Sequence, residues 1–171
     1  MGVTIHFEGR LKSQNYFDHV VEISEKFAQY NHMEYQIFKE SDKILQRVKD
    51  EKDWDYKGST QGIKIQPDIN SDPLWIEFDK YYYIQEYCKT QFVDIHVHVK
   101  IIELLRLIEP YFADLVVTDE GEYWDTTDEK ILQENFDTCF NAIEDAKNEN
   151  SKLSGPYRIT GGRIVDLMKN D

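Results

Sequence analysis

The spacing of hydrophobic residues changes along this chain, and the order of the changes limits the folds open to it. Between residues 33 and 88, short runs alternate apolar and polar residues, which is typical of strands with one buried face. Segments on both sides of this region instead repeat apolar residues every third or fourth position, as helices do. Consecutive strands bracketed by helices favour an antiparallel sheet with helices packed against it.

Three segments have the apolar stripe of a helix with one buried face. They cover residues 14–30, 93–112 and 126–147. Ser13 is a suitable N-cap for the first helix, and Thr126 followed by Glu129 is a capping-box signature for the third. The second helix has the broadest apolar surface, so we expect it to be the most buried of the three.

The strand patterns are short and separated by turn-forming residues. They cover residues 3–8, 33–39, 43–49, 62–66, 74–78, 81–88 and 114–118. Glu40-Ser41-Asp42 is typical of a turn, and a two-residue loop at Asp79-Lys80 would join the hairpin of residues 74–88. In that register one face of the hairpin carries Trp75, Glu77, Tyr82, Ile84 and Glu86. This face is a candidate docking surface if the helices cover the other.

These patterns predict an α+β domain. We expect an antiparallel sheet of five to seven strands with two or three helices packed on one face, elaborating a split β-α-β plan. The length of 171 residues fits a single domain, 1–171. Within it, residues 148–156 read as a polar linker to a C-terminal β-hairpin around Gly161-Gly162.

The charge balance excludes several classes of partner. The chain has 33 acidic and 20 basic residues, for a net charge of −13. Because nucleic acids and anionic membranes are bound through Lys and Arg, we expect neither as a partner. No apolar run reaches the roughly 18–20 residues of a membrane span, and no signal-peptide pattern is present, so we expect a cytoplasmic protein.

The sequence contains no established cofactor or catalytic motif. It has no phosphate-binding or dinucleotide-binding glycine loop, no nucleophile elbow and no H-E-x-x-H zinc motif. Its two cysteines, Cys88 and Cys139, lack the C-x-x-C spacing of redox and zinc sites. We therefore expect no cofactor.

Residues 119–125, which we call the acidic loop, are the candidate partner-binding site. Its contact residues would be Asp119, Glu120, Glu122, Tyr123, Trp124 and Asp125. Acidic side chains steer and pair with a basic partner, while exposed aromatic rings supply buried area in an interface. The alternative is that both rings fold back onto the core.

The acidic loop favours a small, acidic protein-binding or inhibitor module without catalytic activity, directed at a basic protein partner. In size, acidity and lack of catalytic motifs, the chain resembles many small bacterial proteins and some immunity-type inhibitors.

Asp94, His96 and His98 form an alternative site, which would make the protein a small metal-binding domain or enzyme. On a strand, the three side chains would share one face and could hold a metal ion. On a helix, the two imidazoles diverge by roughly 200°, and the flanking pattern is helical, so we expect no metal site. The pair Glu77 and Glu86 would be the corresponding candidate for acid–base chemistry. A third reading is a structural homo-oligomer that pairs through an open sheet face.

Overall fold

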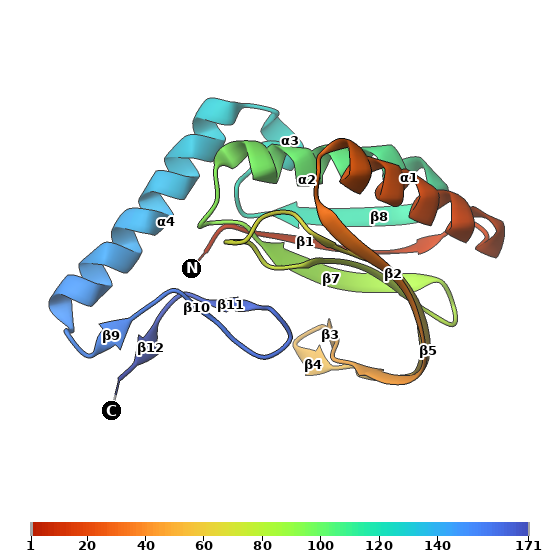
Figure 1. Cartoon of the computed structure of the whole chain (residues 1–171), viewed down its shortest axis with the longest axis horizontal. Coiled ribbons are helices and arrows are strands. Elements are labelled where there is room, and N and C mark those ends of the chain that lie inside the picture. Colours follow the sequence, from red (N-terminus) through yellow and green to blue (C-terminus); the bar gives the residue numbers. More distant parts are fainter. Residues whose placement is uncertain (1, 171) are drawn as a thin grey trace.

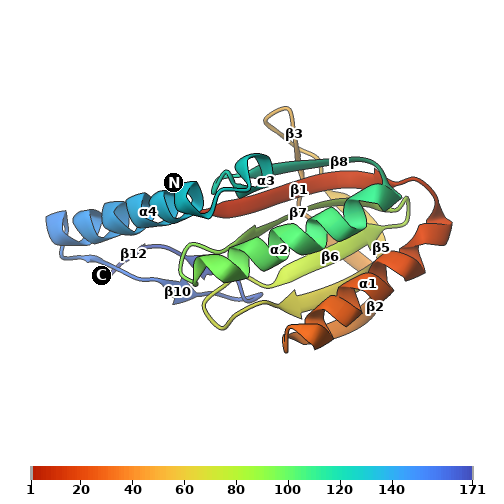
Figure 2. The same cartoon turned by 90° about the horizontal axis from the view of Figure 1, so that it is seen from above.

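The computed structural model describes residues 2–170 and contains two antiparallel three-stranded sheets that lie side by side (Figure 1). The six strands are β1 (Thr4–Leu11), β2 (Glu34–Leu45), β5 (Tyr56–Gln66), β6 (Leu74–Asp79), β7 (Tyr83–Lys89) and β8 (Phe112–Asp119). One sheet has the order β7-β1-β8 and the other β2-β5-β6. In the described residues, β6 and β7 are neighbours without a ladder of backbone hydrogen bonds, so a seam separates the sheets (Figure 2).

Two long helices cover one face of both sheets. These helices are α1 (Phe17–Tyr30), preceded by a 3₁₀ turn (Gln14–Tyr16), and α2 (Ile95–Ile108), followed by a 3₁₀ turn (Glu109–Tyr111). The helices contribute buried side chains to a common core, among them Val20, Phe27, Ile101 and Leu104. The sheets complete this core with fully buried residues such as Ile76. Removing these side chains from water drives the two layers together. The predicted α+β class is confirmed.

The topology contains a split β-α-β unit. Strand β1 pairs antiparallel with β7 on one side and with β8 on the other, so β7 and β8 run parallel with β1 between them. Helix α2 makes the crossover that connects β7 to β8. The second helix expected from the sequence therefore occupies the centre of the helical layer (Figure 2).

The fourth helix extends beyond the sheets. Helix α4 (Glu129–Glu149) follows the short α3 (Tyr123–Thr126), and only its first half lies near the helical layer (Figures 1 and 2). Its N-cap is Asp128, whose carboxylate accepts a hydrogen bond from the Lys130 N–H at 2.8 Å. The expected cap at Thr126 is wrong, because Thr126 belongs to α3.

The remaining strands form three small two-stranded antiparallel pairs. They are β3 (Val48–Lys49) with β4 (Lys52–Asp53), β10 (Tyr157–Arg158) with β11 (Ile164–Val165), and β9 (Leu153–Ser154) with β12 (Met168–Lys169). We call residues 46–55 the β3–β4 arm and residues 157–169 the C-terminal strap. In Figure 1 both lie on the side of the sheets opposite α1 and α2.

Two strand expectations are wrong. Residues 34–45 form one strand, and the expected turn at Glu40-Ser41-Asp42 is a bulge within it, because β5 pairs with β2 on both sides of the irregularity. The connection between β6 and β7 is three residues long, since the Asp79 carboxylate accepts hydrogen bonds from the N–H groups of Tyr81 and Tyr83 at 2.7 and 3.0 Å. The resulting one-residue shift places Ile84 in the core instead of on the open face.

Within residues 2–170, no helix combines the length and the apolar character needed to cross a lipid bilayer.

Candidate binding groove and acidic loop

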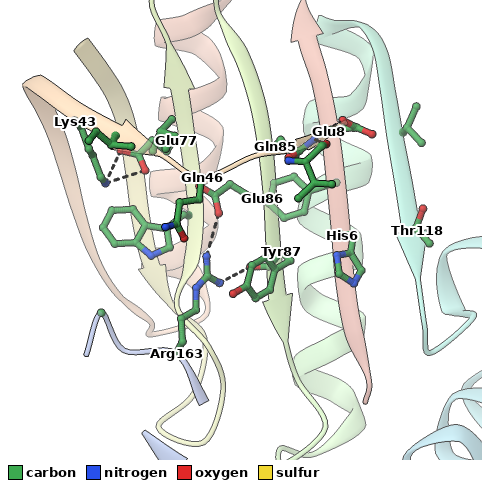
Figure 3. A pocket seen from close by; sticks show the side chains of 17 residues that line it. His6, Glu8, Lys43, Gln46, Glu77, Gln85, Glu86, Tyr87, Thr118 and Arg163 are labelled. Atoms are coloured by element: carbon green, nitrogen blue, oxygen red, sulfur yellow. Dashed lines mark hydrogen bonds and ion pairs between the residues drawn. The ribbon is translucent and has the colours of Figure 1, made fainter. Parts of the chain in front are cut away.

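A groove of about 940 Å³ lies on the helix-free face of the sheets (Figure 3). Its floor comes from β6, β7, β1 and β8, and its walls come from the end of β2, the β3–β4 arm and the strap. The side chains used in the argument below are His6, Glu8, Lys43, Trp75, Glu77, Gln85, Glu86, Tyr87 and Arg163. A hollow of this volume is large enough for a small molecule or a few residues of a peptide.

The β3–β4 arm is fixed over the sheet by two side chains. The buried Arg47 donates to the Asp79 carboxylate at 2.8 Å, and its guanidinium lies 5.0 Å from the centre of the Tyr83 ring. The Gln85 side-chain amide accepts a hydrogen bond from the Val48 N–H and donates one to the Val48 carbonyl, each at 2.9 Å. It thus makes the two hydrogen bonds that the backbone of a neighbouring strand would make. The wall of the groove is therefore held by specific polar contacts.

Arg163 attaches the C-terminal strap to the seam between the sheets. Its guanidinium donates to the Tyr87 carbonyl at 2.6 Å and to Glu86 Oε2 at 3.1 Å, and it lies 3.4 Å from the buried Asp72 carboxylate. The same group stacks 4.0 Å from the centre of the Tyr87 ring. Asp72 also accepts the Ile164 N–H at 2.7 Å, so the strap is anchored at two consecutive residues.

At the other end of the groove, both carboxylate oxygens of Glu77 accept hydrogen bonds from neighbouring side chains. Lys43 Nζ contacts both Glu77 oxygens at 2.9 and 2.7 Å, and the Thr60 hydroxyl donates to Oε2 at 2.7 Å. Lys43 also lies 4.4 Å from the centre of the Trp75 ring. Both charges are therefore satisfied within the protein.

Glu86 lies at the seam and is less completely paired. By strand alternation it shares a side with the core residues Ile84 and Cys88, yet it lines the groove, because no ladder closes the gap between β6 and β7. Burial raises the pKa of Glu86 to about 7, with Arg163 opposing the increase and the charge of Glu77 adding to it. Among the described residues none donates a hydrogen bond to the second carboxylate oxygen, Oε1.

The acidic loop divides into buried and exposed residues. Asp119 is buried, and its oxygens accept the N–H groups of Gly121 and Trp124 at 2.8 and 2.9 Å. Burial acts to raise the pKa of Asp119, but the hydrogen bond and charge of His98 and these N–H donors hold it below its usual value. The side chains of Glu120, Glu122 and Asp125 are exposed.

The two aromatic residues of the acidic loop face inward to different degrees. Only 9% of Trp124 is exposed, and the Arg106 guanidinium lies 3.5 Å from the centre of its ring while donating to its carbonyl. Tyr123 is half-buried against the core. The alternative expectation, that the rings of the acidic loop fold back onto the core, thus holds for Trp124 and in part for Tyr123.

In the alternative metal site, the structure keeps Asp94 and His96 in contact, with His96 Nδ1 2.5 Å from the Asp94 carboxylate, but places His98 away from both. Asp94 is the N-cap of α2 and accepts the His96 N–H at 2.9 Å, His96 is exposed, and His98 is fully buried. Instead, His98 Nε2 lies 3.0 Å from Asp119 Oδ1, and His98 Nδ1 lies 2.7 Å from the Thr90 hydroxyl. All three side chains are buried. In residues 2–170, no three His, Cys, Asp or Glu side chains come together as a metal site.

The acidic loop and the groove are neighbours. A second hollow of about 290 Å³ shares His6 and Tyr87 with the groove and reaches Glu120 and Asp166. The Glu120 carboxylate lies 3.8 Å from His6 Nε2 and accepts the Thr4 N–H at 2.8 Å. An extended ligand can therefore touch both surfaces at once.

Sequence reasoning identified only part of this groove. The expected hairpin register put Glu77 and Glu86 on one face of the sheet; that register is shifted by one residue in the structure, yet both side chains line the groove. Lys43 and Arg163 carry no local signal, since only the folded chain brings residues 120 positions apart to the same cavity. The chain matches no known protein-family model, and comparison with curated proteins and with solved structures finds no match.

Proposed function

We propose that this protein is a binding module for a basic protein partner, which it engages through the acidic loop and the adjoining groove. The proposal rests on one observation above others, the contact between Glu120 of the acidic loop and His6 at the end of a groove that has three carboxylates and two Lys or Arg side chains. A surface with excess negative charge attracts a positively charged partner and accelerates their encounter.

The distribution of charge supports this proposal. Eleven of the fourteen acids between residues 103 and 149 are exposed. Burial raises the pKa of Tyr123, and the charges of Glu129 and Glu103 add to the increase, which brings acids of α2 and α4 to the same part of the surface. The two arginines of the strap do not pair with these acids, since Arg158 and Arg163 bond the 69–72 loop and β7.

A charge-reversal experiment tests the proposal. Random peptides displayed on phage are selected on the full chain, and those recovered should be enriched in Lys and Arg. For one recovered peptide, Glu122→Lys with Asp125→Lys should slow association several-fold at low salt and much less at high salt.

The matched control reverses Asp18 and Glu22, two exposed acids of α1 on the helical side, and changes the net charge equally. Equal effects of the two double variants, or recovered peptides without a basic bias, would contradict the proposal.

A further inference from the structure

We propose that Glu86 is the anchoring carboxylate of the groove, and that its Oε1 atom receives the ammonium or guanidinium group of a Lys or Arg side chain from the partner. This inference rests on the proposed function and adds to it a specific contact. The groove would thereby recognise a single basic side chain, while the acidic loop attracts the partner through its net positive charge.

The hydrogen-bond pattern singles out Glu86 among the groove carboxylates. Only 11% of its side chain is exposed, and Arg163 binds Oε2 alone. Glu77 accepts hydrogen bonds from Lys43 on both oxygens, and Glu8 accepts two, from Tyr83 and Gln85 at 2.6 and 3.0 Å, whereas Glu86 accepts one. Glu86 thus combines near-complete burial with an oxygen that still has room for a donor.

The charges around Glu86 favour a cationic ligand. Arg163 from the strap, Lys43 from β2 and Glu77 from β6 face it, and its own strand contributes the buried, neutral thiol of Cys88. Arg163 is also offset by Asp72, and Lys43 by Glu77, so the cluster holds one more negative than positive charge when Glu86 is ionised. An anion would meet this excess directly, whereas a cation restores neutrality.

The neighbouring rings suit the stem of a long basic side chain. Tyr87 and Trp75 both line the groove, and each already stacks with a protein cation, Arg163 at 4.0 Å and Lys43 at 4.4 Å. Lys and Arg bury their apolar stems against such surfaces while the charged end remains hydrogen-bonded. A short polar cation would gain only the contact with the carboxylate.

Binding of a cation is coupled to a proton on Glu86. Burial raises its pKa to about 7, so at pH 6 the carboxyl is mostly protonated and must release a proton before it can pair with the ligand. The affinity of the wild-type protein should therefore increase about tenfold between pH 6 and pH 8. In Glu86→Gln this tenfold increase should be absent, because the amide that replaces the carboxyl does not titrate.

The probe is a fluorescent peptide, Gly-Ser-Gly-Arg-Gly-Ser-Gly, titrated into the full-length protein and followed by anisotropy. We expect Glu86→Gln to weaken binding about tenfold at pH 8, and the matched variant Glu22→Gln, which removes an exposed carboxylate of α1 outside the groove, to change it less than twofold. Replacing the Arg of the peptide by citrulline, which keeps the shape and removes the charge, should abolish the effect of Glu86→Gln. Carbon-13 NMR of the Glu86 carboxyl provides a second readout, because adding the Arg peptide at pH 6.5 should shift this signal toward the ionised form.

The outcomes separate this inference from the proposed function. Binding that is weakened by reversal of Glu122 and Asp125 but insensitive to Glu86→Gln and to pH would overturn the role of Glu86 and leave the acidic-loop proposal intact. The opposite pattern would support Glu86 and contradict the acidic loop. If free spermidine binds as tightly as the Arg peptide, the groove is a site for a soluble amine, and the assignment to a partner side chain is wrong.

Discussion

At the scale of single residues, Glu86 combines burial with a carboxylate that the protein satisfies on one oxygen only. Arg163 binds Oε2, and Glu77 adds a second negative charge nearby. A buried carboxylate in this setting destabilises the fold when it is ionised, because the interior solvates the charge less well than water does. Residues that reduce stability in this way are often retained for function.

Replacing Glu86 with Gln is expected to remove a pH dependence from the stability of the fold. Because burial raises the pKa of Glu86 from 4.5 to about 7, the folded state holds an extra proton between these values. The stabilisation of the folded state by this proton is fully present below pH 4.5 and is lost as the pH rises through 7. The total loss in the free energy of unfolding is about 3 kcal/mol. Urea unfolding at pH 5, 6, 7 and 8 measures this pH dependence. The free energy of unfolding of the variant should exceed that of the wild type most at pH 8.

The exposed Glu122→Gln serves as the control, and its stability should follow the wild-type profile. A wild-type minus Glu86→Gln difference that stays constant from pH 5 to pH 8 would show that Glu86 titrates normally.

At the scale of elements, the β3–β4 arm depends on one buried ion pair. Arg47 and Asp79 are each 3% exposed, and the rings of Trp54, Tyr56 and Tyr83 surround the guanidinium at 5.7, 5.3 and 5.0 Å. Arg47→Ala leaves Asp79 buried without its cation, so we expect a loss of about 3–5 kcal/mol in the free energy of unfolding and rapid proteolysis within residues 46–55. Mass spectrometry of the protease fragments locates the cut.

Lys49→Ala, on the same arm but exposed, is the matched control and should leave both stability and cleavage nearly unchanged. Resistance of Arg47→Ala to protease in the arm would mean that Gln85 and the surrounding packing hold it without the ion pair.

Elements with a strong local pattern were predictable, and elements set by a single side chain were not. The apolar stripe of residues 17–28 determines the buried face of α1 by itself, as the burial of Val20, Val21, Ser24, Phe27 and Ala28 shows. The length of the connection between β6 and β7, and with it the face on which each β7 side chain lies, depends instead on two hydrogen bonds to Asp79, which period-two alternation does not encode. The burial of Asp119 likewise depends on its bonds to Gly121 and Trp124 and on His98, 21 positions away in the sequence.

At the scale of the whole molecule, the core is divided. The main cluster joins α1 and α2 to both sheets and contains Cys88, whereas a smaller cluster holds α4 against Val3 and Val99 and contains Cys139. The smaller cluster has six buried residues, and helix α4 extends past the sheets (Figure 1). A region with less buried apolar surface opens at a lower cost in free energy than the rest of the fold.

The two cysteines report on these clusters independently. Both thiols are buried, and burial raises the pKa of each, so neither should react with a thiol reagent in the native state. With increasing urea below the global midpoint, Cys139 should become reactive before Cys88, because α4 can detach while the main core stays folded. Pulse labelling with a maleimide, followed by mass spectrometry of Cys88→Ala and Cys139→Ala, assigns each rate to one thiol. Identical urea dependence of the two rates would mean that α4 and the sheets unfold as one cooperative unit, and that the extension of α4 beyond the sheets does not make its docking the weaker part of the fold.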